Sequence, residues 1–118
     1  MPFIPKPKLW RWTNHAKFKM RFYGLSEARV RRIINSPKRK EEGIAPKTIA
    51  MMQVAGSTKH PYELWAMVQD NPKTRTVISA WRYPGTTKPG SEIARGILKT
   101  EHREYSSKSD FENNDNNK

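Results

Sequence analysis

Cysteine is absent from this chain, and so are long hydrophobic runs. Without cysteine there is no disulfide bond and no thiolate metal site, which is typical of a reducing compartment, and we expect the protein in the cytoplasm. No stretch approaches the roughly 18 consecutive apolar residues of a membrane span. The apolar segments near the N-terminus are too short for a signal peptide. The sequence therefore predicts no membrane partner.

Acidic residues are also scarce: 11 Asp and Glu stand against 23 Lys and Arg, a net charge of +12. The excess is uneven along the chain. Residues 99–118 carry four basic and five acidic side chains, which leaves 19 basic and 6 acidic ones, a net charge of +13, in residues 1–98. A body this basic favours a polyanion as its partner, RNA or the ribosome first and an acidic protein second.

The chain of 118 residues is long enough for one domain with one modest core. We expect an extended arm rich in Pro and Lys over residues 1–11 and the folded domain over 12–85. A linker with a short helix, capped by Ser91, is expected over 86–104. A disordered polar tail is expected over 105–118.

Two helices are predicted at the start of the domain. Thr13 is a suitable N-cap for a first helix that ends at Gly24, where a left-handed residue is needed. Ser26 is a suitable N-cap for a second helix, which the Asn-Ser-Pro sequence at 35–37 ends. The buried side of the second helix is expected to consist of Leu25, Val30, Ile33 and Ile34.

From residue 48 onward the hydrophobic pattern alternates with a period of two. This pattern predicts strands over 48–54, 62–69 and 74–83, and the Asp-Asn-Pro-Lys turn joins the last two as a hairpin. The preceding PKRKEEG segment is predicted to be a polar loop. The expected fold is α+β, with two N-terminal helices packed on a small antiparallel sheet of three or four strands.

The first helix carries two polar side chains on its apolar side. At 100° per residue, His15 and Lys19 lie in the middle of an arc that includes Phe18 and Phe22. Because a buried charge without a partner is costly, the two must pair inside the protein or line a cleft. In a cleft, His15 could act as general base or acid while Lys19 holds a phosphate oxygen, which would allow RNA cleavage without a metal.

A structural role is the alternative for both residues. His15 would then be a satisfied core residue, and Lys19 would extend past its aromatic neighbours into solvent. If the site is catalytic, Tyr23 would orient groups or donate a proton, and Arg82 would bind phosphate across the cleft. The sequence leaves both alternatives open.

Aromatic and basic residues alternate in SAWRYPG, residues 79–85. On a strand, Trp81 faces away from Arg82. Aromatic rings beside arginine can stack on bases and bind phosphates, so both residues are nucleic-acid candidates, although Trp81 alone is better explained as a core residue. Arg75 is predicted to lie on the opposite face from Arg82, so the two are not expected to act together. Further contacts with nucleic acid are expected from Arg29, Arg31, Arg32 and Arg75.

The three histidines lie far apart in the sequence and near no carboxylate cluster, so no metal site is expected. No motif for a cofactor is found either. His60, in a loop before a strand, is a lesser candidate for acid–base chemistry.

Residues 15–26, HAKFKMRFYGLS, resemble the signature of a family of small bacterial proteins classified as a domain of unknown function. The signature is roughly H-A-x-x-R-M-x-x-R-G-I-S. Lys19 and Tyr23 stand at its two arginines, so Lys19 keeps the charge and Tyr23 does not. The segment VISAWRYPG is similar to the last strand of the family. The resemblance covers residues 12–85, about three-fifths of the chain.

Domains of this family are similar in layout to RelE-type toxins, the small basic ribonucleases of toxin–antitoxin systems. The resemblance implies a RelE-like fold, RNA as substrate and, if the protein is a toxin, an acidic antitoxin that covers the basic face. We therefore predict a small RNA-binding domain, with metal-independent endoribonuclease activity as the enzymatic hypothesis. A non-catalytic nucleic-acid-binding module and a protein-interaction module are the alternatives, because fold does not determine function.

Overall fold

The computed structural model describes the backbone of residues 8–116 and the side chains of residues 8–106. The rest of the predicted arm and tail, residues 1–7 and 117–118, lies outside the described residues. In chain order the elements are β1 (Leu9–Trp12), α1 (Asn14–Tyr23), α2 (Glu27–Asn35), β2 (Arg39–Glu42), β3 (Thr48–Gly56), β4 (Pro61–Asp70), β5 (Thr74–Tyr83) and α3 (Glu92–Asn116).

The strands of the described range form one five-stranded sheet in the order β1-β5-β4-β3-β2. Strands β2 to β5 pair antiparallel, whereas β1 is parallel to β5. The predicted α+β class is confirmed, but the antiparallel sheet of three or four strands was wrong in detail. The predicted arm supplies β1, and the predicted PKRKEEG loop supplies β2. The half-buried Trp10 and Trp12 explain β1, because they pack against the core and aromatic residues suit strands.

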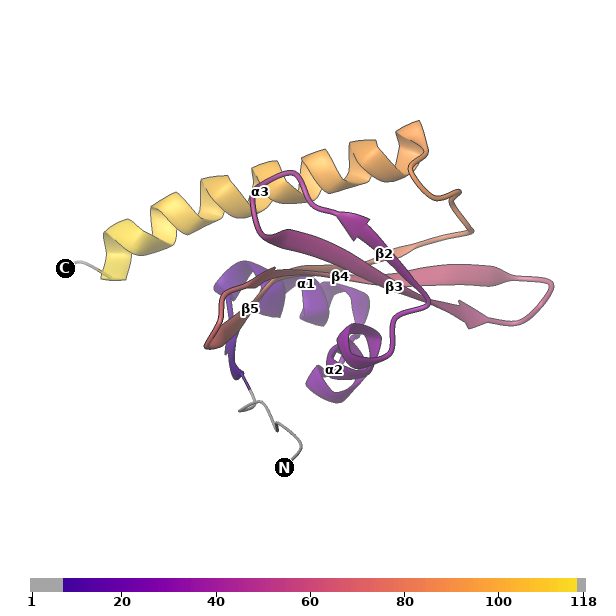
Figure 1. The fold of residues 1–118 in the computed structure, drawn as a ribbon, viewed down its shortest axis with the longest axis horizontal. Helices are drawn as coiled ribbons and strands as arrows, with labels where there is room; N and C mark the ends of the chain where they lie inside the picture. Colours follow the sequence, from indigo (N-terminus) through magenta and orange to yellow (C-terminus); the bar gives the residue numbers. More distant parts are fainter. Residues whose placement is uncertain (1–7, 117–118) are drawn as a thin grey trace, which may run out of the picture.

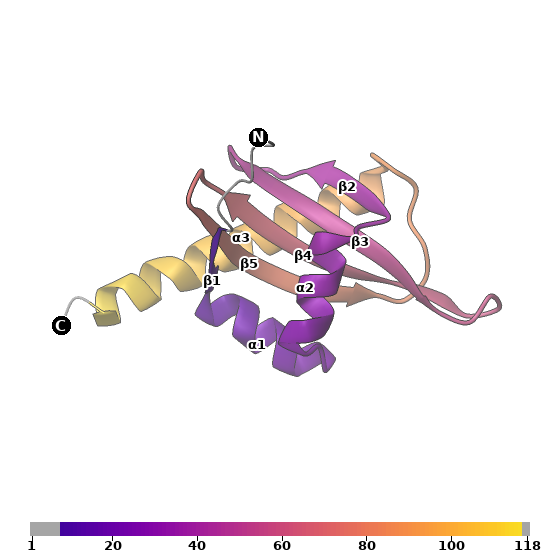
Figure 2. The ribbon, with the colours of Figure 1, turned by 60° about the horizontal axis from the view of Figure 1, so that its bottom comes forward.

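Helices cover both faces of the sheet. Helices α1 and α2 lie on one face and α3 crosses the other (Figure 1). Figure 2 shows the α1–α2 pair in front of the sheet and α3 behind it. Each face has its own apolar core, the first including Val30, Ile33 and Leu64, and the second including Trp65 and Leu98. Because both faces are covered, six consecutive residues of β4 are buried, as in strands at the centre of a layered domain.

The two N-terminal helices begin and end where the sequence predicts. The Thr13 side chain accepts a hydrogen bond from the Ala16 N–H at 3.0 Å, and Gly24 closes α1 in the left-handed conformation with φ of 69°. The Ser26 side chain caps α2 by accepting from the Arg29 N–H at 3.1 Å. These caps satisfy backbone donors that the first turn of a helix leaves without partners.

A β-bulge interrupts the pairing of β5 with β4. Met67 pairs with Ser79 and Val68 pairs with Val77, so Ile78 is an extra residue on β5. A bulge exchanges the faces of the residues that follow it. Beyond the bulge, Trp81 therefore packs in the second core, under α3, and Ala80 packs in the first.

Helix α3 is much longer than the short helix that we predicted. The Ser91 side chain accepts from the Ala94 N–H at 3.2 Å, as expected of its cap, but the helix continues to Asn116, through most of the segment predicted to be disordered. Leu98 is buried, whereas Ile93 is 59% exposed. Among the described residues, none of the helices combines the length and the apolar character needed to cross a membrane.

Candidate functional site

The two polar residues of α1 are buried against α3. The Lys19 ammonium donates a hydrogen bond to Glu101 Oε2 at 2.8 Å, and the Ser79 hydroxyl donates to Glu101 Oε1 at 2.5 Å. Glu104, on the next turn of α3, lies 3.6 Å from Lys19 Nζ. Lys19 and Glu101 are 9% and 5% exposed. The ammonium is therefore paired inside the protein and does not line an open cleft.

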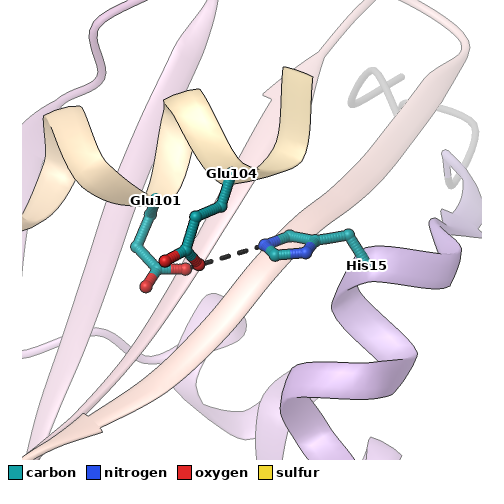
Figure 3. A group of neighbouring side chains, drawn as sticks. All are labelled: His15, Glu101 and Glu104. Carbon is teal, nitrogen blue, oxygen red and sulfur yellow. Dashed lines mark ion pairs between the residues drawn. The ribbon is translucent and has the colours of Figure 1, made fainter. Parts of the chain in front are cut away.

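His15 lies beside this ion pair and is almost fully buried, at 1% exposure. Figure 3 shows its ring pointing from α1 toward the carboxylates of Glu101 and Glu104 on α3. The distance from His15 Nε2 to Glu101 Oε1 is 3.8 Å, too long for a hydrogen bond, and neither ring nitrogen has a hydrogen-bond partner among the described residues. A histidine in this position cannot reach an RNA backbone in solution.

The pairing moves the pKa values of both charged partners. Burial by itself would raise the pKa of Glu101. The adjacent His15 ring and the hydrogen bonds that Lys19 and Ser79 donate outweigh the effect of burial and hold the pKa below its ordinary value. Burial would lower the pKa of Lys19, but the hydrogen bond and charge of Glu101 raise it above its ordinary value. Both groups are therefore charged at neutral pH.

We predict that the folded state loses stability in acid through Glu101. The pKa of this carboxyl is lower in the folded than in the unfolded chain, so its contribution is present above the unfolded pKa and is lost as the pH falls through the folded pKa, below about pH 5. Urea unfolding at a series of pH values measures the effect. The slope in the acid range should be smaller for Glu101→Gln, and an unchanged slope would contradict the assignment.

The donor atoms of His15, Glu101 and Glu104 lie within 4.8 Å of one another, close enough to surround a metal ion. Two carboxylates and an imidazole would suit a divalent cation. However, the Lys19 ammonium already lies against both carboxylates, at 2.8 Å and 3.6 Å. A metal would have to displace this bound positive charge, so the arrangement is better described as an ion-pair network than as a metal centre.

Of the predicted catalytic quartet, only Tyr23 and Arg82 line the same hollows, and His15 and Lys19 are not among the lining residues. His15 and Lys19 are buried under α3, the half-buried Tyr23 lies with its ring 5.3 Å from Lys19 Nζ, and Arg82 is exposed outside the ion-pair network. The geometry favours the structural alternative for His15 and Lys19, in which they attach α3 to α1.

Most of the residues predicted to contact nucleic acid are engaged elsewhere. Trp81 is 3% exposed and stacks on Trp65 with ring centroids 5.7 Å apart, so the proposed stacking of Trp81 on bases is wrong for this structure. Arg75 donates two hydrogen bonds to Asp70, each 2.8 Å long. Arg31 lies over the rings of the two β1 tryptophans, 4.6 Å from one and 5.4 Å from the other. The remaining two candidates are the half-buried Arg29 and the exposed Arg32.

Arg82 lies at the centre of a different basic surface. Its guanidinium carbon is 3.9 Å from the centre of the Tyr62 ring on β4. We call this region the Arg82 surface and define it as Arg29, Lys59, His60, Tyr62 and Arg82. The bulge at Ile78 explains the arrangement: Arg82 turns to the face that carries α1 and α2, the same face as Arg75, so the predicted opposition of these two arginines was wrong.

Arg82 lines three hollows, and the one against α3 is also lined by Glu92 and Glu101. The other two are shared with Tyr62. One, of about 460 Å³, is lined by Lys59, His60, Tyr62 and Arg82 among others. The other, of about 210 Å³, is lined by Arg29, Tyr62 and Arg82 among others. Neither lining includes an acidic residue. The Nε atom of Arg29 is buried and has no hydrogen-bond partner among the described residues. In these two hollows, the described residues provide no carboxylate that would neutralise the positive charge of the Arg82 surface.

Sequence reasoning missed Tyr62 and Lys59 as members of this site. Tyr62 belonged to a predicted strand, where an aromatic residue is ordinary, and Lys59 lies in a hairpin turn. Only the pairing of β4 with β5 could have indicated that Tyr62 belongs to this site. Leu64 pairs with Arg82, and Tyr62 lies two residues before Leu64 on the same face of β4, so Tyr62 is a diagonal neighbour of Arg82. That register depends on the bulge.

No family model, curated protein or solved structure matches this chain. The resemblance of residues 15–26 to the H-A-x-x-R-M signature and the RelE-like layout therefore stay predictions.

Proposed function

We propose that this protein binds RNA through the Arg82 surface and that His15 and Lys19 are structural. The observation that supports this proposal is the position of Arg82, stacked on Tyr62 where two hollows without acidic residues meet. A guanidinium offers a planar fork of donors that suits a phosphate group. An aromatic ring beside it can stack on an unpaired base.

Single-stranded RNA fits this surface better than the other polyanions. The tyrosine and arginine pair can contact both the base and the phosphate of one nucleotide, whereas an acidic protein would use only the charge. The sequence resemblance of residues 12–85 to a family that is similar in layout to RelE-type ribonucleases also favours RNA as the partner. The excess of basic residues in 1–98 adds a nonspecific attraction that concentrates RNA at the surface.

An acidic protein remains the second candidate partner because α1 carries exposed apolar and basic residues. Phe22 is 71% exposed there, and Lys17 and Arg21 are exposed on the same helix. A partner with acidic and apolar groups would match this combination. RNA would cover the Arg82 surface and this partner would cover α1, so variants at the two places separate the candidates.

We predict that Arg82→Glu weakens RNA binding by about tenfold or more, because a hydrogen bond to a charged group contributes about 1.5–3 kcal/mol. Fluorescence anisotropy with a short single-stranded RNA measures the dissociation constant. Arg103→Glu is the matched control: it changes the net charge equally, but Arg103 is an exposed residue of α3 outside the Arg82 surface. The affinity of wild type should fall steeply as salt rises.

Equal losses in Arg82→Glu and Arg103→Glu would contradict a defined surface and leave only nonspecific attraction. The same RNA is recovered after incubation with EDTA, and we expect it intact because His15 is buried. Defined fragments in that sample would contradict the non-catalytic proposal and would direct attention to His60, whose side chain lines the same hollow as Arg82.

A further inference from the structure

A groove of about 530 Å³ separates α3 from the ends of α1 and β5. We call it the α3 groove. Aromatic rings from two elements line it, Tyr23 at the end of α1 and Tyr83 at the end of β5. Ile93 and Ile97 contribute apolar surface from α3. This volume lies within the range of about 300–1,000 Å³ that small-molecule sites occupy, and its aromatic lining suits a flat ring.

Two polar groups of the α3 groove lack partners. Glu92, in the first turn of α3, is exposed and makes no ion pair or side-chain hydrogen bond with the described residues. The indole Nε1–H of Trp81 is buried and has no acceptor among them. A buried donor without an acceptor is unfavourable, so a ligand that supplies one would be favoured. The groove thus offers an exposed carboxylate acceptor beside aromatic rings, one of which is the Trp81 indole.

The Arg82 side chain turns to the opposite face of the sheet from α3, but the α3 groove and the 210 Å³ hollow adjoin each other because Tyr23 and Arg82 line both. A nucleotide whose phosphate lies on the guanidinium would have to extend its base past Tyr23 to enter the α3 groove. The other carboxylate of the groove, Glu101, is occupied by Lys19 and Ser79, so its charge does not repel a phosphate as an unpaired one would.

We propose that the α3 groove binds a guanine base of the RNA whose phosphate contacts Arg82. The inference rests on the proposed function and adds a base preference to it. Guanine has two adjacent donors, N1–H and the N2 amine, which can both donate to the one carboxylate of Glu92. Adenine, cytosine and uracil lack a pair of adjacent donors on that edge.

Gly96 provides a direct test because it lines the α3 groove and a Cβ atom added there meets no atom within 4 Å. Gly96→Leu should fill the groove while α3 stays folded, since leucine favours a helix more than glycine does. Lys99→Leu, at an exposed position of the same helix, is the matched control. A second variant, Glu92→Gln, removes the charge of the carboxylate and leaves the volume unchanged.

The readouts separate the groove from the Arg82 surface. Wild type and Lys99→Leu should bind GMP more tightly than UMP by about tenfold or more, the size of one good bidentate contact to a base, as followed by tryptophan fluorescence. Gly96→Leu should lose GMP binding and keep the affinity of wild type for oligouridine. Glu92→Gln should bind GMP and AMP equally. Arg82→Glu should weaken oligouridine binding.

Equal binding of GMP and UMP by wild type, with oligouridine bound through Arg82, would overturn the guanine site and leave the proposed function standing. Unchanged GMP binding in Gly96→Leu would mean that the base binds outside the α3 groove, and this result would also overturn the guanine site. If wild type binds neither oligouridine nor GMP, the proposed function and the guanine site both fall.

Discussion

Replacing Glu101 by alanine is expected to lower the free energy of unfolding by about 3–5 kcal/mol, the usual loss when one partner of a buried ion pair is removed. The variant leaves the Lys19 ammonium buried beside His15, without its 2.8 Å partner. It also leaves the buried hydroxyl of Ser79 without the acceptor that it contacts at 2.5 Å. Urea unfolding followed by circular dichroism measures the loss.

Glu104→Ala is the control on the same helix. The side chain of Glu104 is 46% exposed and lies 3.6 Å from Lys19, so its removal should change the free energy of unfolding by no more than about 0.5 kcal/mol. A loss below about 1 kcal/mol for Glu101→Ala would mean that Lys19 finds water and that the pair does not attach α3.

The double variant Lys19→Met with Glu101→Leu should recover much of the stability that Glu101→Ala loses. Replacement of a buried ion pair by apolar side chains of similar size is often neutral or stabilising. RNA binding by the folded double variant should equal that of wild type if Lys19 is structural. A loss of RNA binding in the folded double variant would show that Lys19 contributes to binding, contrary to the proposed function.

Replacing Glu63 by alanine is expected to lower the free energy of unfolding by about 3 kcal/mol or more, because the buried Trp65 indole and the partly buried Thr87 and Arg39 lose one shared acceptor. Glu63 is 1% exposed and accepts from the Trp65 indole at 2.9 Å and from the Thr87 N–H at 2.7 Å. The Arg39 guanidinium lies 3.7 Å from the same carboxylate. These contacts hold the segment between β5 and α3 against the sheet.

The loosening of the segment between β5 and α3 can be measured separately from the stability of the whole protein. Amide hydrogen exchange at Thr87 should become faster in Glu63→Ala under native conditions, since local opening no longer breaks a hydrogen bond to a buried carboxylate. Glu42→Ala, an exposed residue of β2, is the control and should leave both quantities unchanged. Unchanged protection of Thr87 in Glu63→Ala would contradict this role.

Local signals predicted the α1–α2 unit and the central strands well. Thr13, Gly24 and Ser26 act on the backbone of their own turns, so the limits of α1 and α2 are visible in a short window of sequence. The alternation over 74–83 likewise identified β5 with its observed ends, because a strand with distinct faces requires a period of two.

Other helices and strands form or pack against segments that are distant in sequence, and a short window of sequence does not contain these segments. The polar sequence of β2 has no strand pattern, and it becomes a strand because it pairs with β3. Helix α3 begins at Glu92, beyond residue 85, where the sequence predicts the end of the folded domain. The sequence therefore indicates that His15 and Lys19 need a partner but does not identify Glu101 as that partner.

By itself, the sequence of this protein determined the basic charge, the capped helix pair, the alternating strands and the need of Lys19 for a buried partner. Only the tertiary structure decided the rest. Glu101, the partner of Lys19, lies 82 residues away along the chain, and the extra residue Ile78 turned Arg82 toward Tyr62. Capping and periodicity act between near neighbours in sequence, whereas ion pairing and strand register depend on which distant segments pack together.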